Sequence, residues 1–175
     1  VPLIQEFEKI KKIEQILVTT STLSSSKIFR KFRFKKTLHQ FYPLDNVHIV
    51  NNFLNYWRPS SVFFVESEIW PTMISQLKKK KIRIVLINAR MSYKSFKRWF
   101  TLRYFGKNIL EKFDYIFPQN KETFSYFKKL GINKLKVLGN LKFITTHSDK
   151  LKEINKKKFK KRTVLCSAST HHNEE

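Results

Sequence analysis

Polar side chains follow four short apolar runs of the sequence, at the point where each run ends. The four segments read TTSTLSSSK, VESEIW, INARMS and GNLKF. Their hydroxyl, carboxylate, amide and cationic groups belong to Thr20, Ser21, Glu66, Glu68, Asn88, Arg90, Ser92, Asn140 and Lys142. If the runs are parallel strands of one sheet, these groups meet at its carboxyl edge, where open α/β folds bind ligands. A carboxylate between cations there suits a site that handles phosphates and an anionic sugar.

Each segment alone also has a purely structural interpretation. The hydroxyls of Thr19–Lys27 can bind phosphate or sugar, or they can cap the helix that follows, because Ser and Thr are common N-cap residues. Glu68 can act as a first-turn acid that interacts favourably with a helix dipole. Lys142 is one of many lysines. The joint placement of these groups at strand ends is what favours a site.

The elements that must position these groups follow an α/β pattern. Short β-branched runs recur along the chain, and segments with helical periodicity lie between them, as in βαβ units of a parallel sheet. The predicted strands are Glu14–Thr20, Leu38–Pro43, Ser61–Glu66, Arg83–Asn88, Tyr115–Pro118, Lys136–Leu138 and Thr163–Ser167.

Capping and proline signals predict the helices. Asp45 is the expected N-cap of a helix that ends before Pro59. Pro71 lies in the first turn of the next helix, where a missing amide hydrogen costs nothing. Tyr93–Phe113 is expected to be one long helix, in which aromatic residues alternate with basic ones. A core-facing stripe with a basic exposed back is favoured there over a membrane-surface helix. The start, Val1–Phe7, resembles an amphipathic helix.

The composition limits the possible functions. Of the 175 residues, 36 are Lys or Arg and 13 are Asp or Glu, which gives a formal charge of +23. Such a charge attracts nucleic acid, anionic lipid surfaces or phosphorylated ligands, although an AT-biased composition also places many lysines on a solvated surface. The single cysteine, Cys166, excludes an internal disulfide and a zinc site built on several cysteines, and it fits a reducing compartment. The three glycines cannot form a P-loop or a dinucleotide fingerprint.

The two ends of the chain carry their own signals. No apolar run approaches the roughly 20 residues needed to span a bilayer, and the start lacks both a signal peptide and an initiator Met. We therefore expect the chain to begin inside a larger protein. The last five residues, HHNEE, hold two His and two Glu. Adjacent ligands point in different directions and the spacing of a zinc-binding helix is absent, so no metal site is predicted.

Taken together, the motifs resemble a known family. The segments TTSTLSSSK, HQFYPLDN, VESEIWP, INARMS, LGNLKF and ASTHHNEE occur in the order and at the spacing of the 3-deoxy-D-manno-oct-2-ulosonic acid (Kdo) transferases of lipopolysaccharide synthesis. The resemblance covers nearly the whole chain. It implies a Rossmann-like parallel sheet with helices on both faces, as the N-terminal half of a glycosyltransferase of the GT-B type.

The resemblance also implies a domain organisation and an activity. Residues 1–148 would form the acceptor-side domain with a truncated start, residues 149–162 a basic linker, and residues 163–175 the start of an absent nucleotide-sugar-binding domain. The implied reaction moves Kdo from CMP-Kdo to the lipid A precursor, lipid IVA, at the cytoplasmic face of the inner membrane. No metal or other cofactor is implied. The implied partners are the lipid A precursor, CMP-Kdo and an anionic membrane surface, without nucleic acid.

Roles for individual residues follow from the same resemblance. Glu66 and Lys142 match residues that stabilise the transition state: a carboxylate can stabilise oxocarbenium character on the sugar, and an ammonium can offset charge on the leaving phosphate. Arg90 and Ser92 resemble residues that hold a phosphorylated acceptor. His171 falls in a loop near the donor nucleotide. The remaining substrate-binding candidates at strand ends are Thr20, Ser21, Asn88 and Asn140. Because side chains alternate along a strand and Glu68 already enters the helix, Glu66 is expected to face the crevice, and Glu68 to support the helix start or pair with a nearby cation such as Arg90.

The sequence also departs from the family pattern. The family's catalytic base is a Glu in a Gly-Glu motif located just before the point where this chain begins, so the chain alone is expected to transfer no Kdo. The hydroxyl-rich first loop lacks the family's usual Pro and Gly. Two other functions stay open: another two-domain glycosyltransferase that acts on lipid A precursors, and a basic nucleic-acid-binding domain. The second should show a groove-reading motif or an exposed aromatic platform, and neither is found.

Overall fold

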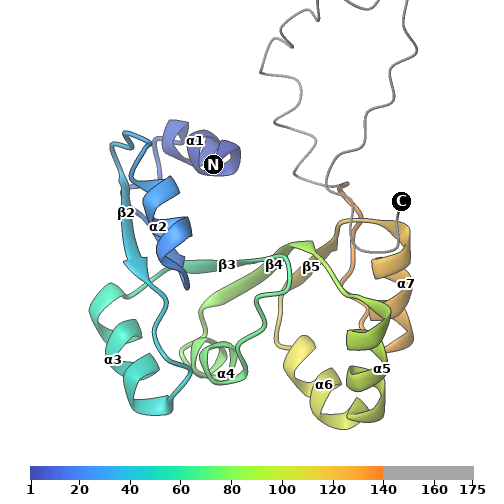
Figure 1. Cartoon of the computed structure of the whole chain (residues 1–175). Helices are drawn as coiled ribbons and strands as arrows, with labels where there is room; N and C mark the ends of the chain where they lie inside the picture. The colour runs from blue at the N-terminus through green and yellow to red at the C-terminus, as the bar shows by residue number, and fades with distance from the viewer. Residues whose placement is uncertain (140–175) are drawn as a thin grey trace, which may run out of the picture.

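The computed structural model describes residues 1–139, which form an α/β arrangement of parallel strands and helices (Figure 1). The strands are β1 (Ile16–Thr20), β2 (Thr37–Phe41), β3 (Ser61–Val65), β4 (Arg83–Ala89) and β5 (Tyr115–Pro118). The helices are α1 (Pro2–Lys9), α2 (Leu23–Phe29), α3 (Val47–Trp57), α4 (Pro71–Lys79), α5 (Tyr93–Thr101), α6 (Arg103–Leu110) and α7 (Lys121–Lys129). The first five predicted strands are confirmed. The seventh, Thr163–Ser167, lies outside the described residues.

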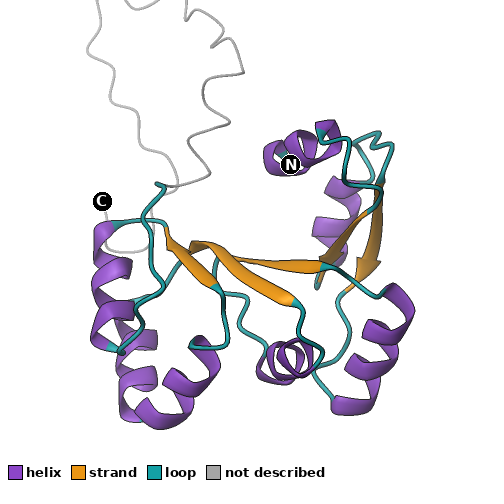
Figure 2. Ribbon diagram, turned by 180° about the vertical axis from the view of Figure 1, so that it is seen from behind, coloured by secondary structure: helices purple, strands orange, loops and turns teal. Residues whose placement is uncertain are grey.

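The strands form two parallel sheets. One holds β1 and β2, and the other has the order β3–β4–β5. Among residues 1–139, no backbone hydrogen bond joins β1 to β3. Figures 1 and 2 show α3, α4 and α6 on one side of the β3–β5 sheet, and α1 and α2 on the other side, next to the β1–β2 sheet. The predicted α/β class with parallel strands and helices on both faces is therefore confirmed.

The core lies between the β3–β5 sheet and the helices beneath it. Phe64, Leu86 and Ile116 are in register on the three strands and are buried. Phe113 is 1% exposed and meets the ring of Phe64 edge-on at a centroid distance of 5.7 Å. Since this face takes every second residue of each strand, the alternating pattern of the strands is what directs their apolar side chains into the core.

Asp45 does not cap the helix for which it was predicted. Asn46 is the N-cap of α3, because its Oδ1 accepts the His48 backbone N–H at 2.9 Å. The predicted end of this helix is confirmed: α3 ends at Trp57, Arg58 turns the backbone with a left-handed φ of 43°, and Pro59 follows, which disfavours a right-handed helical conformation in the residue before it. Asp45 and Asn46 are both good caps, so the sequence could not separate them.

The predicted long helix is two helices. The chain breaks at Leu102, with φ −88° and ψ 35°, and α5 and α6 pack against each other. Gly106 makes this close approach possible, because a Cβ there would lie 2.6 Å from Cε3 of Trp99 and 3.2 Å from its carbonyl oxygen. The predicted core-facing stripe is correct for the buried Leu110 and Phe113 and for the half-buried Phe96 and Trp99, but it is wrong for Phe100, which is 46% exposed.

We expect Gly106→Ala to lower the melting temperature. Alanine gains about 1 kcal/mol of helix propensity over glycine, but the added methyl group must displace Trp99, and such overpacking costs about 1–3 kcal/mol. Combining it with Trp99→Leu should recover part of the loss, because the smaller side chain makes room. Thermal unfolding of the three variants tests this, and a raised melting temperature for Gly106→Ala alone would contradict the steric argument.

The predicted strand Lys136–Leu138 is wrong. The segment before it pairs with β5 through an isolated bridge between Ile116 and Leu135. Ile116 N–H donates to the Lys134 carbonyl at 3.0 Å, and Lys136 N–H donates to the Ile116 carbonyl at 3.2 Å. Gly139 then turns the backbone with a φ of 87°. A single bridge at the edge is too short to count as a strand.

Asp114 links α4 to the start of β4. Its carboxylate accepts hydrogen bonds from the Lys78 ammonium at 2.9 Å and from the Ile84 backbone N–H at 2.8 Å. Partial burial raises the pKa of Asp114, but the hydrogen bonds from Lys78 and Ile84 and the charges of Lys78 and Lys134 together lower it below the ordinary value. The ionised carboxylate therefore stabilises the folded state.

This pKa shift gives a pH-dependent prediction. Because the folded-state pKa of Asp114 is lowered, its contribution is present above the ordinary Asp pKa of about 3.9 and is lost as the pH falls through the folded-state value. Asp114→Asn should therefore lower the melting temperature at pH 7, and the difference from wild type should shrink at low pH. A difference that is constant from neutral to acidic pH would contradict the electrostatic origin.

Candidate functional site

The carboxyl ends of β3 and β4 are joined into one edge by backbone hydrogen bonds. Glu66 N–H donates to the Ile87 carbonyl at 3.0 Å, and Arg90 N–H donates to the Glu66 carbonyl at 3.2 Å. The Ser67 hydroxyl donates to the Arg90 carbonyl at 3.0 Å. The structure therefore brings the VESE and NAR segments together, with the carboxylate of Glu66 and the guanidinium of Arg90 on adjoining turns.

Two of the predicted site residues hold a left-handed backbone. Glu66 has a φ of 60° and Asn88 a φ of 51°. A non-glycine residue in this region costs about 1–3 kcal/mol and persists only where the surrounding structure fixes it, which is common at functional sites. Asn88 is buried, with 4% exposure, and Glu66 is half-buried. Strain at two adjoining strand ends supports the hypothesis that this edge is functional.

Glu68 belongs to a different group of contacts. Its Oε2 accepts the indole N–H of Trp70 at 2.7 Å, and the Trp70 ring stacks on Tyr42 at a centroid distance of 4.9 Å. Trp70 is the N-cap residue of α4, so Glu68 supports the helix start through a side chain rather than by capping the backbone. Within residues 1–139, no ion pair joins Glu68 to Arg90.

Ser92 and Arg90 lie where β4 leads into α5. The Ser92 hydroxyl caps α5, since its oxygen accepts the Ser95 backbone N–H at 3.2 Å. Arg90 is exposed at the edge. Ser92 therefore has a structural role as a helix cap, and the exposed Arg90 places a cation at the edge of the sheet.

Thr20 and Ser21 lie in the other sheet. The Thr20 hydroxyl is 2.9 Å from Nε2 of His39, across the β1–β2 pair. Their neighbour Thr22 caps α2 by accepting the Ser25 backbone N–H at 3.2 Å, so the capping interpretation of the hydroxyl-rich loop holds at that residue. No hydrogen bond in the described part of the chain joins Thr20 or Ser21 to the turns after β3 and β4. Asn140, Lys142 and His171 lie outside the described residues.

The residues that the sequence analysis missed lie in the loop between β2 and α3. Both carboxylate oxygens of Asp45 accept backbone N–H groups at the start of α4, from Thr72 at 3.0 Å and from Met73 at 2.8 Å. The Tyr42 hydroxyl is buried without a hydrogen-bond partner. Burial, followed by the charges of Asp45 and Glu68, raises the pKa of Tyr42. The motif HQFYPLDN drew attention to this loop, but nothing local reveals contacts with residues so distant in the sequence.

The pocket that the structure forms beside β2 and α3 does not include the predicted site residues. It has a volume of about 530 Å³ and is lined by Gln40, Pro43, Ile49, Phe53, Tyr56 and Trp57. Within residues 1–139, no group of three His, Cys, Asp or Glu side chains could hold a metal ion, and no helix is both long and apolar enough to cross a membrane.

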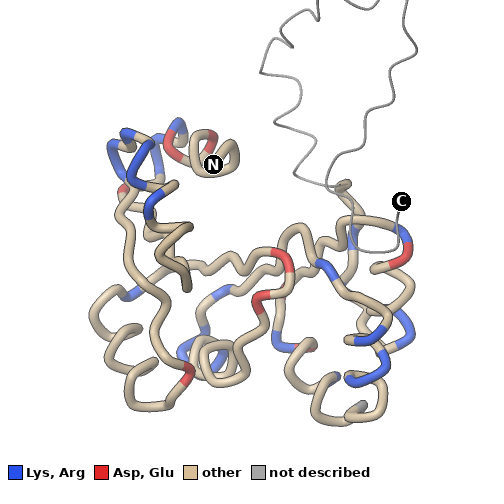
Figure 3. The backbone as a smooth tube through the Cα atoms, viewed as in Figure 1, with Lys and Arg blue, Asp and Glu red and all other residues tan. Residues whose placement is uncertain are grey.

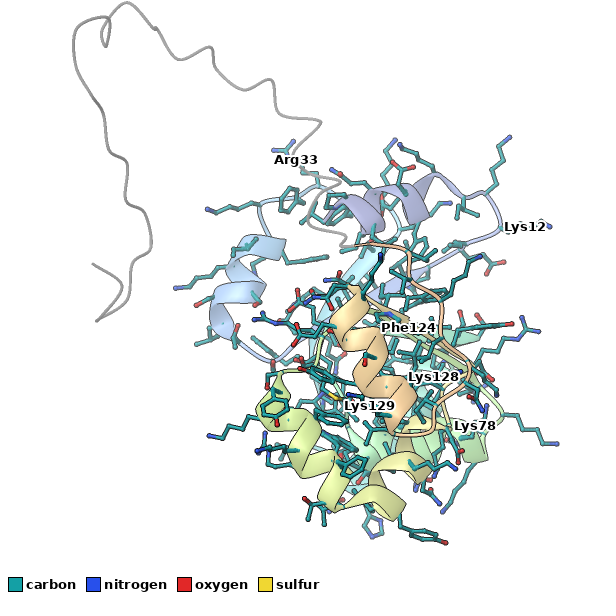
Figure 4. The ribbon with its side chains drawn as sticks, turned by 90° about the vertical axis from the view of Figure 1, so that its right-hand side faces the viewer. Lys12, Arg33, Lys78, Phe124, Lys128 and Lys129 are labelled. Atoms are coloured by element: carbon teal, nitrogen blue, oxygen red, sulfur yellow. The ribbon has the colours of Figure 1, made fainter. Side chains whose placement is uncertain are left out.

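Lys and Arg occur at many positions along the described backbone, both in the segments around α1 and α2 and in those around α5 and α7, as Figure 3 shows. Figure 4 shows Lys12 and Arg33 at one end of the molecule and Lys78 toward the other. Lys12 and Arg33 lie in the loops that lead into β1 and β2, at the amino ends of these strands. The positive charge is therefore not confined to the carboxyl edge that carries Glu66 and Arg90.

Known proteins with similar sequences are described as transferases. A 3-deoxy-D-manno-octulosonic acid transferase of Rickettsia prowazekii is 37% identical over 180 residues, covering 99% of this chain and 38% of its own length. A probable mitochondrial 3-deoxy-D-manno-octulosonic acid transferase of Arabidopsis thaliana is 37% identical over 120 residues, covering 67% of this chain and 27% of its own length. A bifunctional glycosyltransferase/methyltransferase of Fusobacterium nucleatum is 28% identical over 182 residues, covering 99% of this chain and 28% of its own length.

The chain thus spans less than two fifths of the length of these three relatives. The model of one protein family matches residues 1–145, which include both strained strand ends and the loop of Asp45. The match covers most of the chain. On this evidence, the chain belongs to the family of 3-deoxy-D-manno-octulosonic-acid transferases.

Proposed function

We propose that this chain is the acceptor-side part of a GT-B glycosyltransferase that transfers Kdo from CMP-Kdo to the lipid A precursor, lipid IVA, in lipopolysaccharide synthesis. Family membership supports the reaction class. The observation that carries the proposal is the edge where the backbone of Glu66 is hydrogen-bonded to Ile87 and Arg90, because it places an acidic and a basic residue at adjoining strand ends. A nucleic-acid-binding function has no comparable support.

Each side chain at this edge has a proposed role. Glu66 stabilises positive charge on the reacting sugar, together with Lys142, which offsets charge on the leaving group. Arg90 and Ser92 bind the acceptor phosphate, and Asn88, Thr20, Ser21 and Asn140 complete the contacts with the sugars. His171 serves the donor nucleotide. The proposal needs no metal or other cofactor.

We further propose that residues 1–148 form a domain with a truncated start, followed by a linker at 149–162 and the first part of a nucleotide-sugar-binding domain at 163–175. The split into two sheets supports the truncated start. In the doubly wound order 3-2-1-4-5-6, the first strand lies between the second and the fourth. If β1 to β5 are the second to sixth strands, one parallel strand belongs between β1 and β3.

An anionic membrane surface is the proposed second partner, at the cytoplasmic face of the inner membrane. Support comes from the junction of α5 and α6, where Leu102 is 62% exposed, Tyr104 88% and Phe105 53%. The exposed lysines of α5, Lys94 and Lys97, lie nearby in the sequence. Exposed aromatic and aliphatic side chains beside lysines are typical of segments that lie on an anionic bilayer surface.

The test is direct. The full-length enzyme, incubated with CMP-Kdo and lipid IVA, should form a Kdo-bearing lipid that mass spectrometry detects, whereas the isolated chain should form none. Transfer by the isolated chain would contradict the proposed truncation. A full-length protein that fails with CMP-Kdo but transfers a different sugar to the same lipid would favour another glycosyltransferase of this pathway.

Arg90→Lys should weaken binding of the acceptor by about tenfold or more. The planar guanidinium can hold a phosphate with two hydrogen bonds, which an ammonium cannot reproduce, and a hydrogen bond to a charged group contributes about 1.5–3 kcal/mol. The matched control is Arg83→Lys, which makes the same change at the amino end of β4. Binding of both full-length variants to lipid IVA vesicles measures the effect. Equal losses that vanish with added salt would show that Arg90 acts only as diffuse charge.

A further inference from the structure

The turn between β3 and α4 is fixed at both of its ends. At the β3 end, the backbone N–H and carbonyl groups of Glu66 bond to Ile87 and Arg90. At the α4 end, the carboxylate of Asp45 binds the N–H groups of Thr72 and Met73. Residues 67–71 alone lie between these two points.

The cap that Asp45 supplies is not a local one. Trp70, the N-cap residue of α4, makes no side-chain capping bond, and Pro71 follows it. An acceptor located 27 and 28 residues earlier in the chain therefore satisfies the first free amides of the helix. Asn46, the next residue, caps its own helix in the ordinary way.

The same loop holds the turn through a second contact. Tyr42 stacks on Trp70, with an angle of 27° between the rings, and the Trp70 indole donates to Glu68. Asp45 and Tyr42 together thus contact both the start of α4 and the side chains of the turn. Because Glu66 has a left-handed φ of 60°, its conformation depends on such fixation from outside.

We propose that Asp45 is a positioning residue that holds Glu66 in its left-handed conformation, by anchoring the start of α4 and with it the turn Glu66–Trp70. The consequence for catalysis rests on the proposed role of Glu66, whereas the consequence for the turn does not. Loss of the Asp45 carboxylate frees the two amides of α4, and the strained turn then relaxes toward an ordinary conformation.

The first test is amide hydrogen exchange, followed by NMR on the isolated chain. In Asp45→Ala, exchange at the Glu66 and Arg90 amides should become about tenfold faster, because local opening becomes easier, while the Leu86 amide in the core of β4 stays protected. Asn46→Ala, which removes a cap of similar strength one residue away, should leave the Glu66 and Arg90 amides unchanged. Unchanged exchange in Asp45→Ala, or equal acceleration in both variants, would overturn the proposal. Should Asp45→Ala fail to fold, Asp45→Asn keeps one acceptor and serves in its place.

The second test is a double-mutant cycle in the full-length enzyme. Asp45→Asn should lower kcat about tenfold with little change in KM, and it should lower kcat no further when Glu66 is already Gln, since a positioning residue acts through its partner. Losses that multiply would mean that Asp45 acts on stability alone. If the wild-type enzyme transfers no Kdo, the proposed function fails, and the exchange experiment still decides whether Asp45 holds the turn.

Discussion

On its proposed role as a transition-state stabiliser, replacing Glu66 with Gln in the full-length protein is expected to reduce turnover by about 10²–10³-fold, the usual effect of removing one preorganised stabilising group. Glutamine keeps the shape and the hydrogen-bonding capacity of the side chain but removes its charge. The melting temperature should stay nearly unchanged, because the bonds to Ile87 and Arg90 use the backbone of Glu66. Steady-state kinetics with CMP-Kdo and thermal unfolding measure both effects.

Glu68→Gln is the matched control for this prediction. The Glu68 carboxylate accepts the indole N–H of Trp70, so losing its charge should lower stability by about 0.5–1.5 kcal/mol and leave turnover close to normal. Lys142→Ala should behave like Glu66→Gln if both act on the transition state. Near-normal turnover with a lowered melting temperature in Glu66→Gln would reverse the roles of the two acids.

Truncating Phe113 is expected to have the largest effect on stability. Its side chain is 1% exposed and packs edge-on against Phe64. Removing a buried aromatic ring typically costs about 3–5 kcal/mol, because both the transfer energy and a cavity contribute. Urea unfolding of Phe113→Ala measures this loss. Tyr104→Ala, at a site that is 88% exposed, should change the stability by less than about 0.5 kcal/mol. Similar losses in both variants would mean that the core does not lie beneath the β3–β5 sheet.

Much of the fold could be predicted because its signals are local. The strand Tyr115–Pro118 is found with the predicted bounds, and Ser61–Val65 and Arg83–Ala89 differ from the prediction by one residue. These runs are β-branched and aromatic, and turn residues bound them, so the alternating pattern was readable. The end of α3 was predictable for the same reason, since Pro59 prevents its continuation.

What could not be predicted depends on contacts between distant segments. Nothing in the sequence around Leu102 predicts the break in the helix, which the structure shows together with the close approach of Gly106 to Trp99. Asp45 looked like a local cap, yet its partners are Thr72 and Met73. The parallel pairing of β3 and β4 made it possible to predict that the turns after them are adjacent. The stack of Tyr42 on Trp70 could not be predicted in this way.

The left-handed backbone of Glu66 and Asn88 has a consequence for protein engineering. Glycine adopts this conformation without steric cost, so a library selected only for heat resistance should enrich glycine at both positions. Such variants would lose the carboxylate and the carboxamide that the strand ends present. If the proposed roles of Glu66 and Asn88 hold, selection for folding and selection for turnover favour different residues at these two codons, and a thermostable library of this protein should hold both of them fixed.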